Sequence, residues 1–484
     1  MARIVPSQSR QRRTRIVATI GPASDDEDLI AALVRAGMDV ARVSLSHGSV
    51  EESIQVIRRI RNVSPDIGIL PDLPGPKVRC SAFAARGVQI QPGNEIRICS
   101  SELAPRSSAA RLGIDDAEVI ASLAPGDVLS LGDGAISIEI IDRHGSELLG
   151  RVRSGGRLFG RPGVAVATRH VRNRTPTTDD LERIAALKKE GIDALAVSFV
   201  HDAEDVQAIR AALDDPEVML VSKIETAEAI TNLEAVVRES DAVMVARGDL
   251  GIGLPIEEVP FSQKEIIRTG ARFGRPVITA TQMLESMISS PVPTRAEVTD
   301  VANAVLDGTS AVMLSGETAI GFDPVNVVRT MSRILERAES EIDHSAWGIN
   351  LGTQELTQVA PLSDITAVIS GAAWRASLDG HIAAVIACTR SGATARAISR
   401  FRPSIPIIAV TPSERTRRQL SMSWGVKTVL SRHPADNDSE IWQAVQAVLE
   451  AGYVSVGDVV VVIAGSPYES LSVVDTLRIV RVRR

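Results

Sequence analysis

Four apolar runs, each ending in polar residues, follow one another in the middle of this chain and decide its fold. They read VMLVSKIE (218–225), DAVMVARGD (241–249), PVITATQ (276–282) and SAVMLSGET (310–318). Short runs rich in Val, Ile and Met that are apolar on both faces are typical of buried parallel strands. Helical patterns such as AEAITNLEAVVRES (227–240) separate them. A repeated strand and helix predicts a parallel sheet whose functional side chains gather at one strand edge.

The polar ends of these runs carry the chemistry. Because side chains alternate along a strand, Lys223 and Glu225 should share one face, as should Arg247 and Asp249. Thr281 stands at the end of the third run. We therefore expect two carboxylates, a lysine and hydroxyl groups to converge on one rim.

Four more strands precede these runs, so the chain predicts an α/β fold with a (β/α)8 barrel. They are RIVATIG (15–21), MDVARVSLSHG (38–48), IGILPDLPGPKVR (67–79) and IDALAVSFV (192–200). With the first four they give eight strands, and the active site of such a barrel lies at the C-terminal rim. Thr177 or Thr178 should cap the helix before the fourth of these strands, and Gly191 should end it.

Two further regions have other patterns. Short alternating strands with Gly and Pro turns follow the third strand and predict a small β-barrel lid inserted in the barrel. From about Asp343 the strand and helix alternation starts again, which predicts a C-terminal doubly wound α/β domain. The predicted segments are a flexible arm (1–14), the first part of the barrel (15–75), the lid (76–168), the second part of the barrel (169–343) and the C-terminal domain (344–484).

The composition excludes several classes of protein. The 484 residues are 44% hydrophobic and 23% charged, as in ordinary globular proteins. Aromatic residues make up 3% and the net charge is -7, so neither a nucleic-acid partner nor a membrane surface is expected. No apolar run of about 18 residues predicts a membrane span. Cys80, Cys99 and Cys388 have no metal-ligand spacing, which indicates idle thiols in a reducing cytoplasm.

Six stretches resemble the pyruvate kinase family closely. They are RRTRIVATIGPAS (12–24), RVSLSHG (42–48), ARGDLG (246–251), TATQMLESM (279–287), PTRAE (293–297) and DVANAVLDGTSAVMLSGETA (300–319). The resemblance covers nearly the whole chain, and its motifs are long and specific. It implies a barrel, a β lid after the third strand and a C-terminal regulatory domain, which agrees with the domain order predicted from the pattern alone.

The resemblance also implies a reaction. Pyruvate kinases transfer the phosphoryl group of phosphoenolpyruvate to ADP in the last step of glycolysis, giving ATP and, after protonation of the enolate, pyruvate. A divalent ion neutralises the substrate charge with few protein carboxylates. Glu225 and Asp249 match the family's metal-ligand positions, which implies Mg²⁺ or Mn²⁺. The alternative is that both acids make structural ion pairs at strand ends.

The other site residues are implied by the same matches. Lys223 would stabilise the transferring phosphoryl group and the enolate, although a salt bridge to Glu225 alone is the alternative. The amides of Gly248 and Asp249 would start a helix and bind the substrate carboxylate, with Thr281 as a second contact. The remaining matches are Arg42 with the phosphate, Ser315 and Glu317 with a proton relay, and Arg79 and His47 with the nucleotide side.

The monovalent-cation region departs from the family pattern. Many members bind K⁺ where this chain has Ser44, Ser46, Asp72 and Leu73, and Ser44 and Leu73 replace the usual Asn and Thr. Lys77 stands where K⁺-dependent members have Glu. We therefore predict that the Lys77 ammonium replaces K⁺, so that K⁺ is not required, against the alternative of a solvated loop lysine.

The lid departs as well. The family's lysine for the nucleotide phosphate is Pro162 in FGRPGVAVA (159–167), beside Arg161. Either Arg161 substitutes for that lysine or nucleotide binding is weaker. Val292 replaces an Arg of the family's Pro-Arg-Pro-Thr-Arg motif, so the family pattern does not predict the interface at this position.

A loop of the C-terminal domain predicts a phosphorylated effector. TRSGAT (389–394) offers Thr389, Ser391, Gly392 and Thr394 at a helix start, and the family's equivalent loop binds an effector phosphate. A plain helix cap is the alternative, and SPYESLSVVDTLRI (466–479) lacks the glycines usual in the other half of that site. Family members are usually tetramers, which implies a homotetramer.

Two other functions fit part of the pattern. A lyase or aldolase with a divalent ion and a pyruvate enolate would use the same two acids but needs no lid over a nucleotide. A catalytically silent or weak paralogue would fit the altered lid and cation region. The joint presence of Lys223, Glu225, Asp249 and Thr281 favours the kinase.

Overall fold

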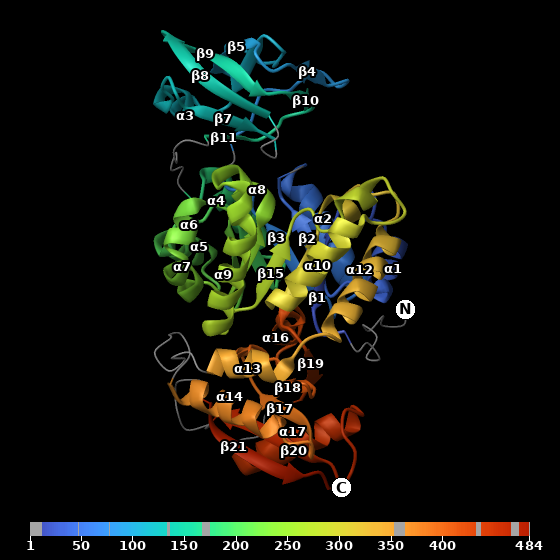
Figure 1. Ribbon diagram of the computed structural model, residues 1–484. Helices are drawn as coiled ribbons and strands as arrows, with labels where there is room; N and C mark the ends of the chain where they lie inside the picture. Colours follow the sequence, from blue (N-terminus) through green and yellow to red (C-terminus); the bar gives the residue numbers. More distant parts are fainter. Residues whose placement is uncertain are drawn as a thin grey trace.

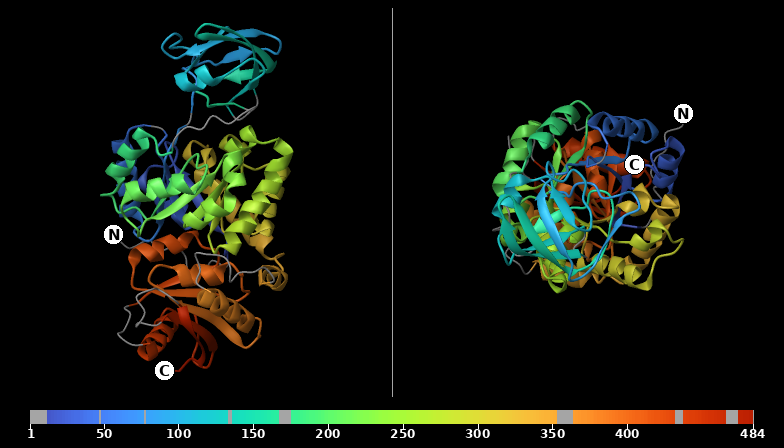
Figure 2. Two further views of the ribbon diagram at one scale, coloured as in Figure 1. Left: turned by 90° about the vertical axis from the view of Figure 1, so that its left-hand side faces the viewer. Right: turned by 90° about the horizontal axis from the view of Figure 1, so that it is seen from above.

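The chain forms three parts stacked along one axis, with the barrel between the lid and the C-terminal domain (Figure 1). The computed structural model describes residues 12–46, 48–76, 78–132, 136–166, 175–352, 364–431, 437–465 and 474–483. Seen from above, the lid lies over the barrel, and in the side view the C-terminal domain covers the barrel's other end (Figure 2).

The predicted eight-stranded parallel barrel is confirmed. It closes in the order β1-β16-β15-β14-β13-β12-β3-β2. The strands are β1 (Arg15–Ile20), β2 (Val40–Ser44), β3 (Gly68–Asp72), β12 (Ala194–Val197), β13 (Met219–Ile224), β14 (Ala242–Ala246), β15 (Val277–Ala280) and β16 (Ala311–Leu314). The first strand pairs with the last, Arg15 opposite Ala311, and this pairing closes the barrel.

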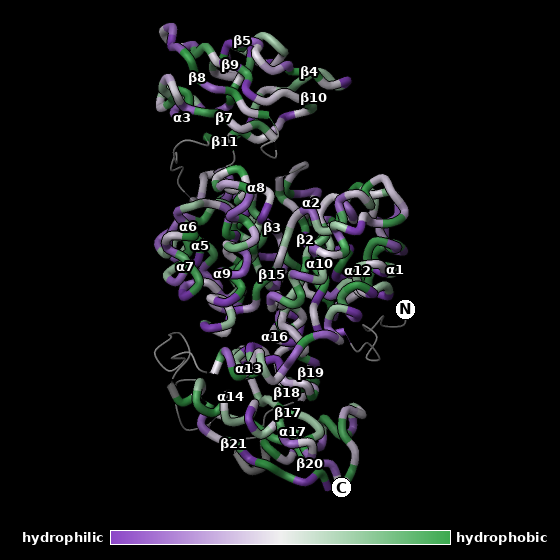
Figure 3. The backbone as a smooth tube through the Cα atoms, in the orientation of Figure 1, coloured by the Kyte–Doolittle hydropathy of each residue, from purple (hydrophilic) through white to green (hydrophobic). Residues whose placement is uncertain are grey.

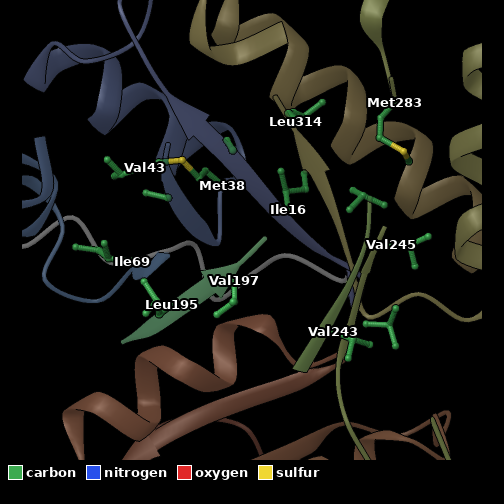
Figure 4. Packing of buried hydrophobic residues seen from close by; sticks show 14 of the residues in the cluster. Ile16, Met38, Val43, Ile69, Leu195, Val197, Val243, Val245, Met283 and Leu314 are labelled. Atoms are coloured by element: carbon green, nitrogen blue, oxygen red, sulfur yellow. The ribbon is translucent and has the colours of Figure 1, made fainter. Parts of the chain in front are cut away.

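Helices surround the strands. They are α1 (Glu27–Ala36), α2 (Val50–Val63), α4 (Thr178–Leu187), α5 (Ala203–Leu213), α6 (Ala227–Thr231), α7 (Leu233–Glu239), α8 (Arg247–Gly253), α9 (Val259–Arg272), α10 (Arg295–Asp307), α11 (Gly316–Ala319) and α12 (Pro324–Glu339), with short 3₁₀ turns at Ile256–Glu258 and Glu285–Ile288. Each strand sends alternate side chains inward and outward. The outward side chains of the barrel strands form a buried apolar layer against the helices, which includes Ile16, Val43, Leu195 and Val243 (Figure 4). The barrel strands are accordingly coloured as largely apolar in the hydropathy view (Figure 3).

Local sequence signals start the helices. Thr177 caps α4, and Asp180 completes a capping box, which confirms one of the two predicted caps. The same box forms at the start of α10 between Thr294 and Glu297. The helix α4 ends at Leu187, and Gly191 lies beyond it with φ 60°.

One strand prediction is wrong at its end. The stretch ARGD was expected to continue β14, with Arg247 and Asp249 on one strand face, but β14 ends at Ala246 and α8 begins at Arg247. The two side chains therefore follow helical spacing. The Asp249 carboxylate lies in the first turn of α8, at the rim of the barrel.

The lid consists of strands and one short helix. Its strands are β4 (Val88–Ile90), β5 (Glu95–Ser100), β6 (Arg111–Ile114), β7 (Val128–Leu131), β8 (Ile136–His144), β9 (Glu147–Ser154), β10 (Gly156–Leu158) and β11 (Val164–Val166), and the helix is α3 (Ala117–Ser122). Six strands form one sheet in the order β11-β7-β8-β9-β5-β6, and β10 pairs with β4. The lid has its own apolar core, which includes Ile96, Ile98 and Ile138.

The C-terminal domain is an α/β sheet in the order β19-β18-β17-β20-β21. Its elements are α13 (His344–Gly352), α14 (Asp364–Ser377), β17 (Ile382–Cys388), α15 (Ala393–Ser399), β18 (Ile407–Thr411), α16 (Glu414–Gln419), a 3₁₀ turn (Leu420–Met422), β19 (Val426–Leu430), α17 (Asn437–Glu450), β20 (Val459–Gly465) and β21 (Val474–Arg481). The sequence predicted the four parallel strands but missed β21, an edge strand antiparallel to β20. Its charged residues, Asp475, Arg478 and Arg481, interrupt the apolar run and hide it from a search for such runs.

The N-terminal segment is anchored where the structure describes it. The sequence assigned residues 1–14 to a flexible arm, but Arg12 is buried and its Nη2 donates to Asp39 Oδ2 at 2.7 Å. Arg13 donates to the Pro403 carbonyl of the C-terminal domain at 2.8 Å. Thr14 is also buried. The last three residues of the predicted arm thus belong to the joint between the barrel and the C-terminal domain.

Among the helices of the described residues, none combines the length and the apolar character that a bilayer crossing needs.

Candidate active site

Lys223 is the centre of a buried group of charges at the rim. It lies near the end of β13, and its Nζ is 2.8 Å from Glu225 Oε1 and 3.5 Å from Asp72 Oδ1. It also donates to Ser198 Oγ at 2.7 Å. Burial opposes the charged form, but Asp72 and Glu225 outweigh burial and raise the pKa of Lys223. Lys223 is therefore a fixed cation at neutral pH.

Asp72 holds a second cation beside Lys223. Arg42 of β2 donates through Nε to Asp72 Oδ2 at 2.7 Å and through Nη1 to Thr19 Oγ1 at 3.0 Å. Burial alone would raise the pKa of Asp72, but Lys223 and Arg42 lower it. One ionised carboxylate thus positions both cations at the end of the barrel.

Glu225 and Asp249 form a pair of neighbouring acids. Glu225 accepts the Phe199 N–H at 2.7 Å and is buried, with an exposed fraction of 3%. Burial is the main cause that raises the pKa of Glu225, and Asp249 adds to it against the lowering effect of Lys223. Two close acids, of which Glu225 is buried, fit a divalent cation, which prefers oxygen ligands. Within the described residues no group of three or more possible ligands forms, so substrate oxygens and water would complete the coordination.

The loop after β15 is strained and tightly braced. Thr281 and Gln282 both have positive φ, 66° and 53°, which is costly for a β-branched threonine. Arg247 holds this loop, since its Nη2 donates to the Thr281 carbonyl at 2.7 Å and its Nη1 pairs with Asp300 at 2.6 Å. Thr281 Oγ1 accepts the Gly248 N–H at 2.9 Å. The strained loop and the start of α8 are therefore one unit.

Gly248 has room beside it in the part of the chain that the structure describes. The three atoms nearest to a Cβ at this position all belong to Thr281 and lie at ordinary contact distances, the nearest being Oγ1 at 3.6 Å. The space over Gly248 suits a ligand that approaches the backbone.

The two relay candidates differ in their partners. Glu317 is fully buried and accepts two backbone N–H groups, from Leu284 at 3.0 Å and from Ser315 at 2.6 Å. Its carboxylate therefore ties the loop after β15 to the end of β16. The Ser315 hydroxyl is buried with no hydrogen-bond partner within the described part of the chain. Ser315 is thus better placed than Glu317 for exchange of a proton.

The nucleotide-side arginines lie in the lid, away from Lys223. The backbone N–H of Arg79 donates to Asp115 Oδ1 at 2.7 Å, and the Arg161 side chain donates through Nη2 to Asp115 Oδ2 at 2.8 Å. Pro162 contributes its carbonyl to Cys80 N–H at 2.9 Å. The Arg161 side chain is 55% exposed. Strand β11 of the lid lies close to α8, so the lid is next to the rim.

The cation region is described in part. His47 and Lys77 lie outside the described residues. Ser44 Oγ accepts the Ser46 N–H at 3.4 Å. Leu73 is buried and its side chain has no oxygen to offer a cation.

The loop 389–394 lies at the other end of the barrel from Lys223, in the C-terminal domain. Thr389 Oγ1 accepts the Gly392 N–H at 2.9 Å, and Thr389, Gly392 and Thr394 are buried. Ser391 is the exposed member of the four. The Thr389 hydroxyl and the Gly392 amide of the predicted phosphate loop therefore already bond to each other.

Comparison with protein families settles the family. Residues 11–328 match the family model described as pyruvate kinase, barrel domain, and residues 367–480 match pyruvate kinase, alpha/beta domain. This chain belongs to the pyruvate kinase family. A pyruvate kinase of Clostridium acetobutylicum is 37% identical over 464 residues, which are 94% of this chain and 96% of that relative. A pyruvate kinase of Staphylococcus aureus is 39% identical over 464 residues, which are 94% of this chain and 78% of the relative.

Pyruvate kinases are phosphotransferases, and this family assignment agrees with the barrel, its rim and the α/β domain. The family generally uses a divalent metal, and it implies phosphoenolpyruvate and ADP as substrates. Three contacts of the pyruvate kinase site were not predicted from the sequence. Lys223 donates to Ser198, the Phe199 amide donates to Glu225, and Arg247, which was predicted at the rim without this role, braces Thr281. Ser198 and Phe199 end the strand IDALAVSFV, and that position was the only signal.

Proposed function

We propose that this chain transfers the phosphoryl group of phosphoenolpyruvate to ADP, giving pyruvate and ATP in the last step of glycolysis. The observation that carries the proposal is the buried Lys223 ammonium between Glu225 and Asp72, at the rim of a pyruvate kinase barrel. A cation fixed in a buried site stabilises charge that develops in the transition state without reorganisation of solvent.

Two cations would neutralise the substrate phosphate. Arg42 and Lys223 both contact Asp72, so they stand side by side before any substrate binds. Arg42 binds the phosphate of phosphoenolpyruvate, and Lys223 stabilises the transferring group and then the enolate oxygen. Asp72 and Ser198 are positioning residues, because they fix the Lys223 ammonium.

Glu225 and Asp249 are the ligands for Mg²⁺ or Mn²⁺ in this proposal. Their closeness and the raised pKa of Glu225 support that role. When bound, the ion supplies positive charge to the substrate oxygens.

The substrate carboxylate would lie at the start of α8. The amides of Gly248 and Asp249 and the Thr281 hydroxyl face this place, and the Gly248 amide already donates to Thr281 Oγ1. A carboxylate oxygen replaces that acceptor when it binds. Thr281 and Ser315 then serve the protonation of the enolate. The Ser315 hydroxyl has no hydrogen-bond partner among the described residues, which supports this role.

On the nucleotide side, Arg79 and Arg161 would bind the phosphates of ADP together with His47. The Arg79 guanidinium donates through Nη1 to the Arg161 carbonyl at 3.3 Å, and this closeness supports a joint role. In Arg161→Ala the KM for ADP should rise about tenfold, the scale of one lost charge-assisted hydrogen bond. An unchanged KM for ADP would refute the substitution of Arg161 for the family's lysine.

We also infer that the enzyme works without K⁺. The Leu73 side chain offers no oxygen where the family's threonine has a hydroxyl, and Asp72 is already paired with Arg42 and Lys223. In this proposal Lys77 supplies the charge of the missing ion near Ser44 and Ser46.

The test is pyruvate formation from phosphoenolpyruvate and ADP with Mg²⁺, with and without K⁺, in buffers free of Na⁺. Turnover in both conditions that is lost in Lys223→Met supports both proposals. Turnover only with K⁺ keeps the kinase and refutes the role of Lys77. No turnover in either condition, with sugar phosphates or AMP present, refutes the kinase.

Assembly, regulation and location complete the proposal. Ile256, Phe261 and Phe322 are large apolar side chains that are 66% to 78% exposed on the barrel, which supports a homotetramer that light scattering can test. The loop with Thr389, Ser391, Gly392 and Thr394 would respond to a phosphorylated effector. The three cysteines are buried and form no disulfide, which supports a cytoplasmic location.

A further inference from the structure

The lid is inserted between β3 and α4 and stands above the rim of the barrel (Figure 1). We call residues 73–75, which follow β3, the outgoing stem of the lid, and Thr175, which precedes α4, its return stem. Both stems contact the loop after β12, which begins with Ser198 and Phe199. This loop therefore lies between the lid and the buried charges of the rim.

The outgoing stem packs closely on this loop. The Ser198 hydroxyl donates to the Leu73 carbonyl at 2.7 Å. Gly75 has φ 63°, and a Cβ there would lie 3.0 Å from the Ser198 carbonyl oxygen and 3.2 Å from Phe199 Cδ2. These distances are shorter than a side chain usually allows, so glycine lets the stem approach the loop. The Gly75 N–H donates to the buried Asp180 at 3.3 Å, which fixes the stem.

The return stem bonds to the same loop. Thr175 is buried, and its hydroxyl donates to the Phe199 carbonyl at 3.1 Å. Thr177 and Asp180 form the capping box of α4, and Asp180 is also the acid that accepts the Gly75 N–H. One carboxylate therefore ties the outgoing stem to the helix that follows the return stem.

Phe199 is the residue at which the two stems and the proposed metal site meet. Its carbonyl accepts from Thr175, its ring lies beside Gly75, and its N–H donates to Glu225 Oε2 at 2.7 Å. Its φ is 53°, a conformation that a non-glycine residue seldom takes and that surrounding contacts must hold. A change at either stem therefore acts on the direction of the N–H that fixes Glu225.

The far end of the loop is fixed to the barrel rather than to the lid. The His201 N–H donates to Asp205 Oδ2 at 2.9 Å. The side chain of Asn232 donates through Nδ2 to the His201 carbonyl at 3.1 Å. Because this end is held by the barrel, a displacement of the stems is taken up at Phe199.

We propose that Phe199 is a positioning residue for the metal site, which couples the position of the lid to the affinity of Glu225 for a divalent cation. This inference rests on the proposed role of Glu225 as a metal ligand. It adds that the two stems of the lid set the position of this carboxylate through one backbone amide. Coupling between two sites is reciprocal, so a bound cation also steadies the stems.

The test is Mn²⁺ binding to the full chain without substrates, followed by electron paramagnetic resonance, in wild type and in Thr175→Val. This variant keeps the shape of the side chain but lacks the hydroxyl that holds the Phe199 carbonyl. It should raise the dissociation constant for Mn²⁺ about fivefold or more, the lower end of couplings between sites. Thr175→Ser keeps the hydroxyl and should bind Mn²⁺ as the wild type does.

Asn232→Ala is the matched control, because it removes one side-chain bond to the same loop from the barrel side. Its affinity for Mn²⁺ should stay close to that of wild type. Equal affinity in wild type and Thr175→Val, or equal losses in Thr175→Val and Asn232→Ala, would overturn the inference alone. No Mn²⁺ binding by wild type would refute the metal role of Glu225, and the inference with it.

Hydrogen exchange at the outgoing stem is a second readout, which a merely structural role of Phe199 would not change. In wild type, saturating Mn²⁺ should slow exchange in peptides that contain the Gly75 amide, the donor to Asp180. Phe199→Gly removes the ring and frees the backbone from its strained φ, so saturating Mn²⁺ should no longer slow exchange there. The same effect of Mn²⁺ in both proteins would contradict the coupling.

Discussion

The two ends of the barrel both bury charged side chains, but they leave their acids in opposite states. At the base, Asp39 lies 2.7 Å from Arg12 and 3.2 Å from Arg15. Burial would raise its pKa, but the two guanidinium groups lower it. At the rim, burial and Asp249 raise the pKa of Glu225 despite the contact with Lys223.

This difference separates an acid that holds the structure from an acid that can take a ligand. Arg12 and Arg15 neutralise the charge of Asp39, so this acid needs no bound cation. Glu225 has the like-charged Asp249 as a neighbour, and this neighbour adds to the rise of its pKa, whereas Asp39 is flanked by two guanidinium groups. A buried acid with a raised pKa beside a second acid therefore marks a place for a cation.

The rim also contains acids of the structural kind. Asp72 has a lowered pKa and holds Arg42 and Lys223, much as Asp39 holds Arg12 and Arg15 at the base. The rim thus contains both structural acids and acids that can bind a cation. The direction in which the pKa of each acid is shifted helps to distinguish the two kinds.

Removal of one cation from each end of the barrel should show the largest difference in kcat between the rim and the base. Lys223→Met should lower kcat by about 10³-fold, because it removes the charge that stabilises the transition state. Arg418→Met is the matched control, since Arg418 pairs with Asp193 at 2.7 Å at the base. It should lower the melting temperature but leave the kcat of folded enzyme within about threefold. Similar kcat values for the two variants would contradict the assignment of Lys223.

Removal of an acid from each end should have the next largest effect. Asp249→Asn should raise the Mg²⁺ concentration for half-maximal activity by about 10–100-fold. Asp193→Asn, at the base, should leave that concentration unchanged, because Asp193 is bound to Arg61 and Arg418. Mn²⁺ binding followed by electron paramagnetic resonance without substrate gives a second readout. An unaltered Mn²⁺ affinity in Asp249→Asn would exclude Asp249 as a ligand.

Loss of the brace on the strained loop should have a moderate effect. Arg247→Gln should lower kcat/KM for phosphoenolpyruvate by about tenfold or more, because Thr281 loses its fixed position. Asp300→Asn removes only the outer partner of Arg247 and should have a smaller effect. The KM for ADP should change little in either variant. Equal changes in both KM values would indicate a general loss of structure.

Acid titration should show the smallest effect. Asp39, Asp72 and Asp241 have lowered pKa values in the folded chain. Unfolded aspartates take up protons near pH 3.9, so the stability that these acids give is present above that pH and is lost as the pH falls further. The melting temperature should therefore decline below about pH 4, and the decline should be about 2 °C smaller in Asp39→Asn. Parallel curves for the two proteins would refute this role of Asp39.

The sequence predicted the barrel because each of its eight strands is an apolar run bounded by polar residues. It predicted Lys223 and Glu225 correctly as neighbours at the rim, since they end one strand. It misplaced Arg247 and Asp249, because no Gly or Pro separates VMVA (243–246) from Arg247 and the helix begins without a side-chain cap. Proline and glycine are the usual signals of such a boundary.

Other features depend on contacts between distant segments, which periodicity does not contain. Ser198 is one hydroxyl at a strand end, and only the closed barrel brings it to Lys223. Arg396 has the sequence context of an ordinary helix arginine, yet the domain joint buries it. The edge strand β21 mixes polar and apolar residues without strict alternation, so its pairing with β20 shows only in the structure.

The pairing of β1 with β16 has a consequence for synthesis on the ribosome. The first strand gains its second neighbour only after Leu314 has been made, and Arg13 finds its carbonyl partner only after Pro403. At about 5–20 residues per second, roughly 15–60 s separate the appearance of β1 from closure of the barrel. During that interval the apolar first strand presents an open edge, which is the form of the chain that chaperones and proteases meet first.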